Sequence, residues 1–291
     1  MFFRKQSEDG YSHPSLTQAF NDVALSPKGL AVVNHCRAIK FPLQVCTSFR
    51  EKILGDCSPA KMRVLAGTGF RTIAHESRHA FQIATQGVQD NHLASPLPYH
   101  IIGRMMEADA AAFTSMVAIE RWHSLGYTAP EKLPPEELKG ADPGEILGLT
   151  IYDHLKKNPR WEAHLMRTLF QYHYDRLQNN TFYESKFMKT AAFMYAQIHD
   201  DLSNFKWFPF PNKKERAQII DNFQNPEKII LPAIEKLGCV LTLDVNYLTE
   251  TRPALTPPGL MKAFHPSVQE LHDVWQGKIS KIIADKYTPK A

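Results

Sequence analysis

Two histidines four positions apart constrain this chain most, because they can act together only if the segment between them is a helix. They lie in His75-Glu76-Ser77-Arg78-His79, which has the pattern H-E-x-x-H. Residues four apart on a helix lie one turn above each other, so His75 and His79 can direct ring nitrogens at one metal ion. Glu76 is turned by about 100° from His75, beside the ion, where it can take a proton from a zinc-bound water. The spacing predicts a zinc site; an exposed helix face with two ordinary histidines is the alternative.

A helical wheel of this segment separates an apolar face from a polar one. Opposite His75 lie seven mostly apolar residues: Ala66, Phe70, Ile73, Ser77, Ala80, Phe81 and Ala84. The two histidines share their side with four polar residues: Thr68, Thr72, Gln82 and Gln86. An apolar stripe at helical spacing packs against a core. We therefore expect the histidines to face away from the packed side and to line a cleft.

A catalytic zinc ion needs a third protein ligand and an open fourth position. Glu107, in the next predicted helix, is the expected third ligand. Its stripe on that helix consists almost entirely of small residues: Gly103, Ala110, Ala111, Thr114 and Ala118. Small residues allow two helices to approach closely, which a carboxylate needs if it is to reach a metal on the neighbouring helix. The alternative is a surface glutamate paired with Arg104.

Two further charged residues lie close to these predicted ligands in the sequence. Asp109 points about 200° away from Glu107 on a helix, so we expect it to orient His75 or His79, or to cap a backbone group, and not to bind the metal. Arg78 is expected to pair with an acidic group or a substrate carboxylate, or to be solvated. Candidates for stabilising the oxyanion of an acyl-transfer transition state are His100, His123, Tyr127 and Tyr152.

The residues from His75 to Gln82, followed by Glu107-Ala108-Asp109-Ala110, resemble a family of uncharacterised bacterial proteins assigned as zinc metallopeptidases. These proteins share the pattern HE-x-RHA-aromatic-Q followed by EADA, and they belong to the zincins with glutamate as third ligand (gluzincin-like). The likeness covers about residues 60–125. It implies that His75, His79 and Glu107 bind Zn²⁺ and that Glu76 is the catalytic base and acid.

The same resemblance implies a reaction and a substrate class. The expected function is hydrolysis of peptide bonds by a Glu-activated, zinc-bound water, with a peptide or protein as the partner. Zincins also run an edge strand along the cleft, to which an extended substrate adds. The alternatives are a zincin-fold protein without proteolytic activity, acting as a binding or regulatory module, and a secreted protease effector.

Hydrophobic periodicity and turn residues predict a mainly helical chain with few strands. Helices are expected at about 29–39, 58–86, 98–125, 144–157, 160–178, 181–203, 213–223, 226–237 and 266–286, and strands at 41–49 and 239–245. Gly67 and Gly69 lie inside the second helical pattern, where they either kink the helix or delay its start to about Phe70. The predicted fold class is mainly α (α+β): a zincin-like metallopeptidase core with an active-site helix, a small sheet and additional covering helices.

The proline-rich segment 128–144 divides the predicted elements. Residues 1–127 are expected to form the zincin-like catalytic core, which contains both the HExxH helix and the helix of Glu107. Residues 145–291 are expected to form a helical region of unknown role that packs on the core. The segment 128–144 is a surface loop or linker, and whether it marks a domain boundary is left open.

Composition excludes several classes of protein. The chain has 34 basic and 30 acidic residues, a net charge of +4, which provides no electrostatic footprint for nucleic acid. No apolar run is long enough for a membrane helix, and the N-terminal residues are not expected to form a signal peptide. We therefore expect no nucleic-acid or membrane partner and a cytoplasmic location, with unconventional secretion left open. The sequence does not indicate an oligomeric state.

Overall fold

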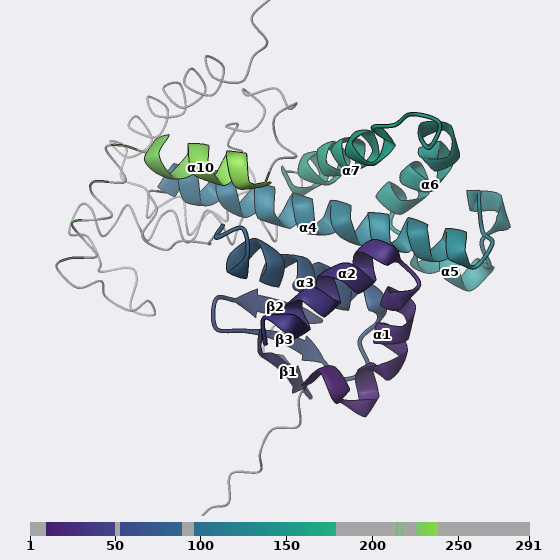
Figure 1. The fold of residues 1–291 in the computed structure, drawn as a ribbon, viewed down its shortest axis with the longest axis horizontal. Coiled ribbons are helices and arrows are strands. Elements are labelled where there is room, and N and C mark those ends of the chain that lie inside the picture. The colour runs from purple at the N-terminus through teal and green to yellow at the C-terminus, as the bar shows by residue number, and fades with distance from the viewer. Residues whose placement is uncertain are drawn as a thin grey trace, which may run out of the picture. The chain divides into compact units, whose positions relative to one another are not determined.

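Figure 1 shows the computed structural model, which describes residues 10–49, 53–88, 96–178 and 227–237, together with a few single positions between 214 and 225. Its helices and strands are η1 Gly10–Ser12, η2 Pro14–Leu16, α1 Thr17–Ala24, α2 Pro27–Ala38, β1 Leu43–Cys46, β2 Gly55–Ser58, β3 Lys61–Leu65, α3 Phe70–Ala84, α4 Pro96–Ser124, η3 Pro130–Lys132, α5 Pro135–Gly140, α6 Pro143–Leu155, α7 Trp161–Gln178 and α10 Glu227–Leu237.

The described chain is mainly helical with one small sheet, so the predicted α+β class is confirmed. Five predicted helices are present within a few residues of their expected bounds: α2, α4, α6, α7 and α10. The elements predicted at 181–203, 239–245 and 266–286 lie outside the described residues, and 213–223 is described only at single positions.

The sheet has three strands in the order β1-β3-β2. β1 pairs with β3 in parallel, with Leu43 opposite Met62, and β2 pairs with β3 in antiparallel fashion, with Gly55 opposite Val64. The side chains of β3 alternate in burial: Met62 and Val64 are fully buried, whereas the residues between and around them are half-exposed. This alternation is the period of two that a sheet with one covered face requires. α3 contacts both β2 and β3, and α1 and α2 pack against α3 in turn.

The helix predicted to begin at Ser58 is wrong in its first part. Residues Lys61–Leu65 form β3, and the Ser58 side chain accepts a hydrogen bond from the Lys61 N–H, so this serine closes the β2–β3 turn instead of capping a helix. Gly67, with φ +77°, then turns the chain in a conformation that glycine adopts freely. α3 begins at Phe70, the later start that the glycine pair predicted. The strand β2 was not predicted, because Gly55-Asp56-Cys57-Ser58 has no apolar alternation.

The segment 128–144 contains short helices and is not a continuous loop. η3 and α5 lie within it, and both begin with proline in the first turn. Asp142 then caps α6 through a capping box with Glu145. Residues group by their contacts into two compact units, 1–89 with 109–173 and 90–108 with 174–291. The predicted division into 1–127 and 145–291 stays a prediction.

Within the first unit, the second half of α4 is tied by charged groups to the helices around it. The Glu120 carboxylate accepts hydrogen bonds from the Ser26 hydroxyl at 2.6 Å and from the Lys28 N–H at 3.2 Å. An anion at a helix N-terminus is stabilised by the unpaired N–H groups there, and α2 begins at this point. Arg121 pairs with Asp22 of α1 and with Glu137 of α5. These contacts fix α4 against α1, α2 and α5.

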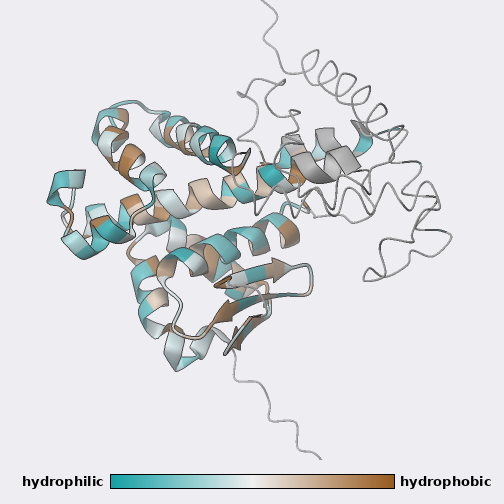
Figure 2. Ribbon diagram, turned by 180° about the vertical axis from the view of Figure 1, so that it is seen from behind, coloured by the Kyte–Doolittle hydropathy of each residue, from teal (hydrophilic) through white to brown (hydrophobic). Residues whose placement is uncertain are grey.

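The hydropathy of the residues differs between the elements. The strands carry apolar stretches, whereas α5 is hydrophilic over most of its length (Figure 2) and has no buried residue. α4 is 29 residues long, yet charged residues interrupt it. In the parts of the chain that the structure describes, no helix combines the length and the apolar character that crossing a membrane requires.

Gly29 of α2 lies where an added methyl group has no room. A Cβ atom on Gly29 would be 2.8 Å from the backbone oxygen of Val23 and 3.1 Å from a side-chain carbon of Val117 on α4. We predict that Gly29→Ala lowers the free energy of unfolding by about 1–3 kcal/mol, measured by urea denaturation. Gly140→Ala is the control, because its Cβ atom would meet only an arginine nitrogen at 3.9 Å. Equal stability of the two variants would contradict this packing.

Candidate metal centre

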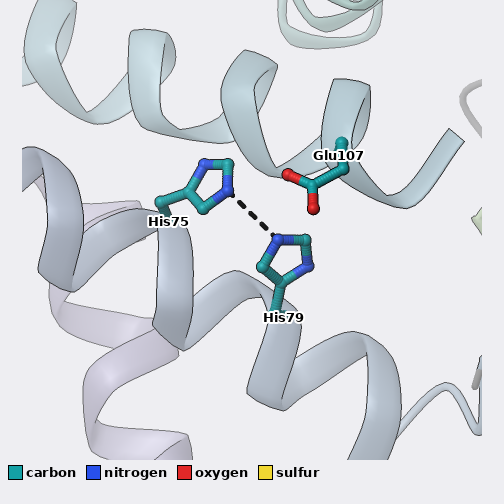
Figure 3. A group of neighbouring side chains, drawn as sticks. All are labelled: His75, His79 and Glu107. Carbon is teal, nitrogen blue, oxygen red and sulfur yellow. Dashed lines mark hydrogen bonds between the residues drawn. The ribbon is translucent and has the colours of Figure 1, made fainter. Parts of the chain in front are cut away.

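Two imidazole rings project from one side of α3 and face each other edge to face (Figure 3). His75 and His79 are four residues apart, and their Nε2 atoms are 3.1 Å from each other. Two nitrogens bound to one tetrahedral Zn²⁺ ion at about 2.05 Å would be roughly 3.3 Å apart. The helix therefore brings the two histidines to the separation that a shared zinc ion needs, as the sequence spacing predicted.

Glu107 of α4 completes a group of three. Its carboxylate points toward the two imidazoles (Figure 3), and one ligand atom from each of His75, His79 and Glu107 lies within 4.8 Å of the others. It is the only group of three or more histidines, cysteines or acidic residues with this proximity among the described residues. Two imidazole nitrogens and one carboxylate oxygen are a donor set that fits zinc, and three protein ligands leave a fourth position for water or substrate.

The burial of α4 shows on which side this group can be reached. From 102 to 122 every residue of α4 is buried except Glu107 and Ala111, which are half-exposed and lie one turn apart. His75 is also half-exposed, whereas His79 is only 8% exposed. The three ligand candidates are thus covered on the His79 side and accessible on the His75 side.

A series of hydrogen bonds links the ring of His79 to Gln82, Asp109 and Arg78. The Nδ1 atom of His79 is 2.8 Å from Oε1 of Gln82, and Nε2 of Gln82 donates to Oδ2 of Asp109 at 2.7 Å. Arg78 donates to both oxygens of the same carboxylate, at 2.7 and 3.1 Å. Arg78 thus pairs with an acidic group, one of the two partners expected for it. Asp109 reaches His79 through Gln82, a residue that sequence reasoning left on a polar face without a role.

The histidine side of α3, expected to line a cleft, is accessible at some positions and buried at others. Gln82 is fully buried and His79 is 8% exposed, whereas Thr72, His75 and Gln86 are half-exposed. Gln82 can be buried here because both ends of its amide are hydrogen-bonded, one to His79 and the other to Asp109. Of the predicted core stripe, Phe70, Ile73, Ser77 and Ala80 are buried, but Ala66 and Ala84 are exposed. Ala66 precedes the helix and Ala84 is its last residue, so neither lies over the sheet.

Glu76 is buried on the side of α3 that faces the sheet. A Cβ atom on Gly55 of β2 would be 2.8 Å from Cγ of Glu76 and 2.9 Å from Cγ2 of Thr72, so β2 can lie this close only because residue 55 is glycine. Burial raises the pKa of the Cys57 thiol, and the nearby Glu76 carboxylate raises it further. Cys57 is therefore a neutral thiol at physiological pH.

The other candidates for stabilising an oxyanion lie elsewhere or outside the description. His123 and Tyr152 contact each other, with ring centroids 4.3 Å apart, near the C-terminal end of α4. His123 is 14 residues after Asp109 on α4, or about 21 Å along the helix axis at about 1.5 Å per residue, so it lies far from the hydrogen-bonded group around Asp109. Tyr127 follows the end of α4 and is farther still from Asp109 along the chain. The side chain of His100 lies outside the described part of α4.

No model of a known protein family, no curated protein and no solved structure matches this chain.

Gly55 is the position where the sheet sets the place of Glu76. We predict that Gly55→Ala lowers the free energy of unfolding by about 1–3 kcal/mol, because the new methyl group overlaps the Glu76 and Thr72 side chains. Gly69→Ala serves as the control, since a Cβ atom there meets nothing within 4 Å. Urea denaturation of both variants measures the difference. A Gly55→Ala variant as stable as Gly69→Ala would show that β2 does not press on Glu76.

Proposed function

We propose that this chain is a zinc-dependent metallopeptidase with a zincin-like core. The observation that carries the proposal is the convergence of His75, His79 and Glu107 within 4.8 Å, with Glu76 buried between the two histidine positions on the same helix. Two further features agree with it. The ligand group is half-exposed on one side, as a substrate requires, and the third ligand is a carboxylate from a separate helix.

His75, His79 and Glu107 are the residues that would hold the zinc ion. A bound Zn²⁺ lowers the pKa of a coordinated water and polarises the carbonyl of a peptide bond. All other steps fall to side chains of this chain. The imidazoles and the Glu107 carboxylate orient the site, and the packing around His79 excludes water from its closed side.

Glu76 is the proton carrier of the reaction. Its carboxylate accepts a proton from the attacking water as the new carbon–oxygen bond forms, and it then gives that proton to the amine as the carbon–nitrogen bond breaks. A peptide and one water become a carboxylic acid and an amine, with no proton left over. Residue 76 is turned by about 100° from His75 on the helix, so it serves this role beside the metal ligands and not as one of them.

The two outer strands of the sheet are β1 and β2. β1 is the predicted strand, but η1 packs against it, so that a Cβ atom on Gly10 would overlap the backbone oxygen of Leu43. β2 is the edge that touches the active helix, because Gly55 lies against Glu76. β1 lies on the other side of β3, about two strand spacings (roughly 9–10 Å) from β2. We propose that a peptide or protein substrate adds to β2 as a further strand. We also propose that the protein acts in the cytoplasm.

Two variants, Glu76→Gln and His79→Ala, separate a loss of catalysis from a loss of metal binding. Glu76→Gln should retain about one zinc per chain and lose at least about 10²–10³-fold in hydrolysis of a fluorogenic casein, because an amide cannot accept the proton. His79→Ala should lose both zinc and hydrolysis. Metal content is measured by mass spectrometry on freshly purified protein.

The outcomes differ for each part of the proposal. Hydrolysis that survives Glu76→Gln contradicts the role of Glu76 as the base. Zinc content unchanged in His79→Ala contradicts the site. Zinc in the wild type with no hydrolysis of any peptide substrate contradicts the peptidase and favours a zincin-fold binding or regulatory protein.

A second prediction tests the choice of third ligand. Glu107→Ala should weaken zinc binding more than Asp109→Ala, because Glu107 supplies a ligand atom whereas Asp109 acts through Gln82. Competition with a chromophoric chelator gives both affinities. If Asp109→Ala is the weaker binder, the third ligand has been assigned to the wrong residue.

A further inference from the structure

We infer that Gln82 is a positioning residue that determines which ring nitrogen of His79 binds the metal, and that Arg78 and Asp109 determine the orientation of Gln82. The inference rests on the proposed zinc site and adds to it the groups that prepare its buried ligand. It follows from the hydrogen-bonding capacity of four side chains, taken one at a time.

The chain of reasoning starts at Asp109, which is 1% exposed. Its carboxylate receives two hydrogen bonds from Arg78, whose guanidinium is always charged. The guanidinium carbon of Arg78 also lies 5.2 Å from the ring centroid of Phe81 and 5.3 Å from that of Phe113, so two aromatic rings help to hold the arginine in place. An ionised carboxylate only accepts hydrogen bonds. Any group that faces Asp109 within bonding distance must therefore be a donor.

This requirement fixes the amide of Gln82. The two ends of a glutamine amide have nearly the same shape, and only the partners decide which end is oxygen. The end that lies 2.7 Å from Oδ2 of Asp109 must be the NH₂ group. The opposite end, 2.8 Å from Nδ1 of His79, is then the carbonyl oxygen. Since Gln82 is fully buried, no bulk water competes for either end.

An amide oxygen can only accept, so Nδ1 of His79 must carry the proton. A neutral imidazole protonated on Nδ1 has its lone pair on Nε2. That atom is the one that lies 3.1 Å from Nε2 of His75. The hydrogen bonds thus leave the lone pair of His79 on Nε2, the nitrogen nearest to the other two ligand candidates, His75 and Glu107. Hydrogen bonds of this kind typically contribute 10–100-fold to metal affinity, because they fix both tautomer and ring orientation.

The same hydrogen bonds also influence the position of Glu107, the proposed third ligand, because Glu107 and Asp109 lie on one helix. Arg78 lies within the H-E-x-x-H segment, and its partner Asp109 follows Glu107 closely on α4. One carboxylate therefore orients a histidine of α3 through Gln82 and holds α4 at the place where it presents Glu107.

The first test needs no variant. In metal-free, ¹⁵N-labelled wild-type protein at a pH where the histidines are neutral, long-range ¹H–¹⁵N spectra distinguish the two tautomers. The signal of His79 is assigned by its loss in His79→Gln. We expect His79 to carry its proton on Nδ1. A proton on Nε2 overturns the inference, whatever the variants do.

The second test removes the acceptor without changing the size of the side chain. Gln82→Met should weaken zinc binding by about 10–100-fold in competition with a chromophoric chelator, and should abolish the preference of His79 for the Nδ1 tautomer. Ser115→Ala is the matched control, because it removes another buried hydrogen bond on α4, the 2.8 Å contact with His173, away from the ligands. We expect Ser115→Ala to bind zinc within about twofold of the wild type.

The results separate this inference from the proposed function. A wild type that binds no zinc contradicts the proposed function. A wild type that binds zinc, combined with Gln82→Met of unchanged affinity, contradicts the role of Gln82 alone. A similar loss of affinity in Gln82→Met and Ser115→Ala also overturns it, because the effect would then reflect stability in general.

Discussion

The buried carboxylate of Asp109 is the constraint on which the arrangement of this site depends. A carboxylate that is 1% exposed is costly unless charged and polar partners surround it. Arg78 and Gln82, both from α3, supply those partners, so Asp109 can be buried only where α4 passes α3 in one register. Glu107 lies close before Asp109 on the same continuous helix, and its position follows from that register. The ion pair between Arg78 and Asp109 therefore helps to set the position of Glu107, although Glu107 is not part of that ion pair.

The site is closed on one side and open on the other, and this asymmetry has chemical meaning. His79 is buried and its ring is fixed by hydrogen bonds, whereas His75 and Glu107 are half-exposed. A purely structural zinc site is closed by four protein ligands, while a catalytic one leaves a position free. Three ligand candidates with one accessible side fit the second kind. Gly55 adds to this by letting β2 lie against Glu76, so that a sheet edge and the proposed base are neighbours.

Much of the helical fold could be read from the sequence, because long periodic segments such as 98–125 and 160–178 have strong signals and clear stops. The strand β3 was misread as helix, since five residues with two buried positions fit either period. The edge strand β2 was missed because its residues are small or polar, and pairing with β3 alone makes it a strand. At the candidate site, the four-residue spacing predicted that the rings of His75 and His79 lie close together, whereas a helical wheel gave no sign of the contacts of Gln82 with His79 and Asp109.

The sequence by itself determined the local geometry: a helix that carries His75, Glu76 and His79 must present both imidazoles on one side and the carboxylate beside them, because backbone hydrogen bonding sets the turn. It also supplied the glutamate that could serve as a third ligand. Only the tertiary structure decided that this glutamate reaches the histidines and that His79 and Gln82 on the polar face of α3 are buried. Those outcomes depend on contacts between residues far apart in the chain, such as Arg78 with Asp109, and no local pattern specifies which distant groups will meet.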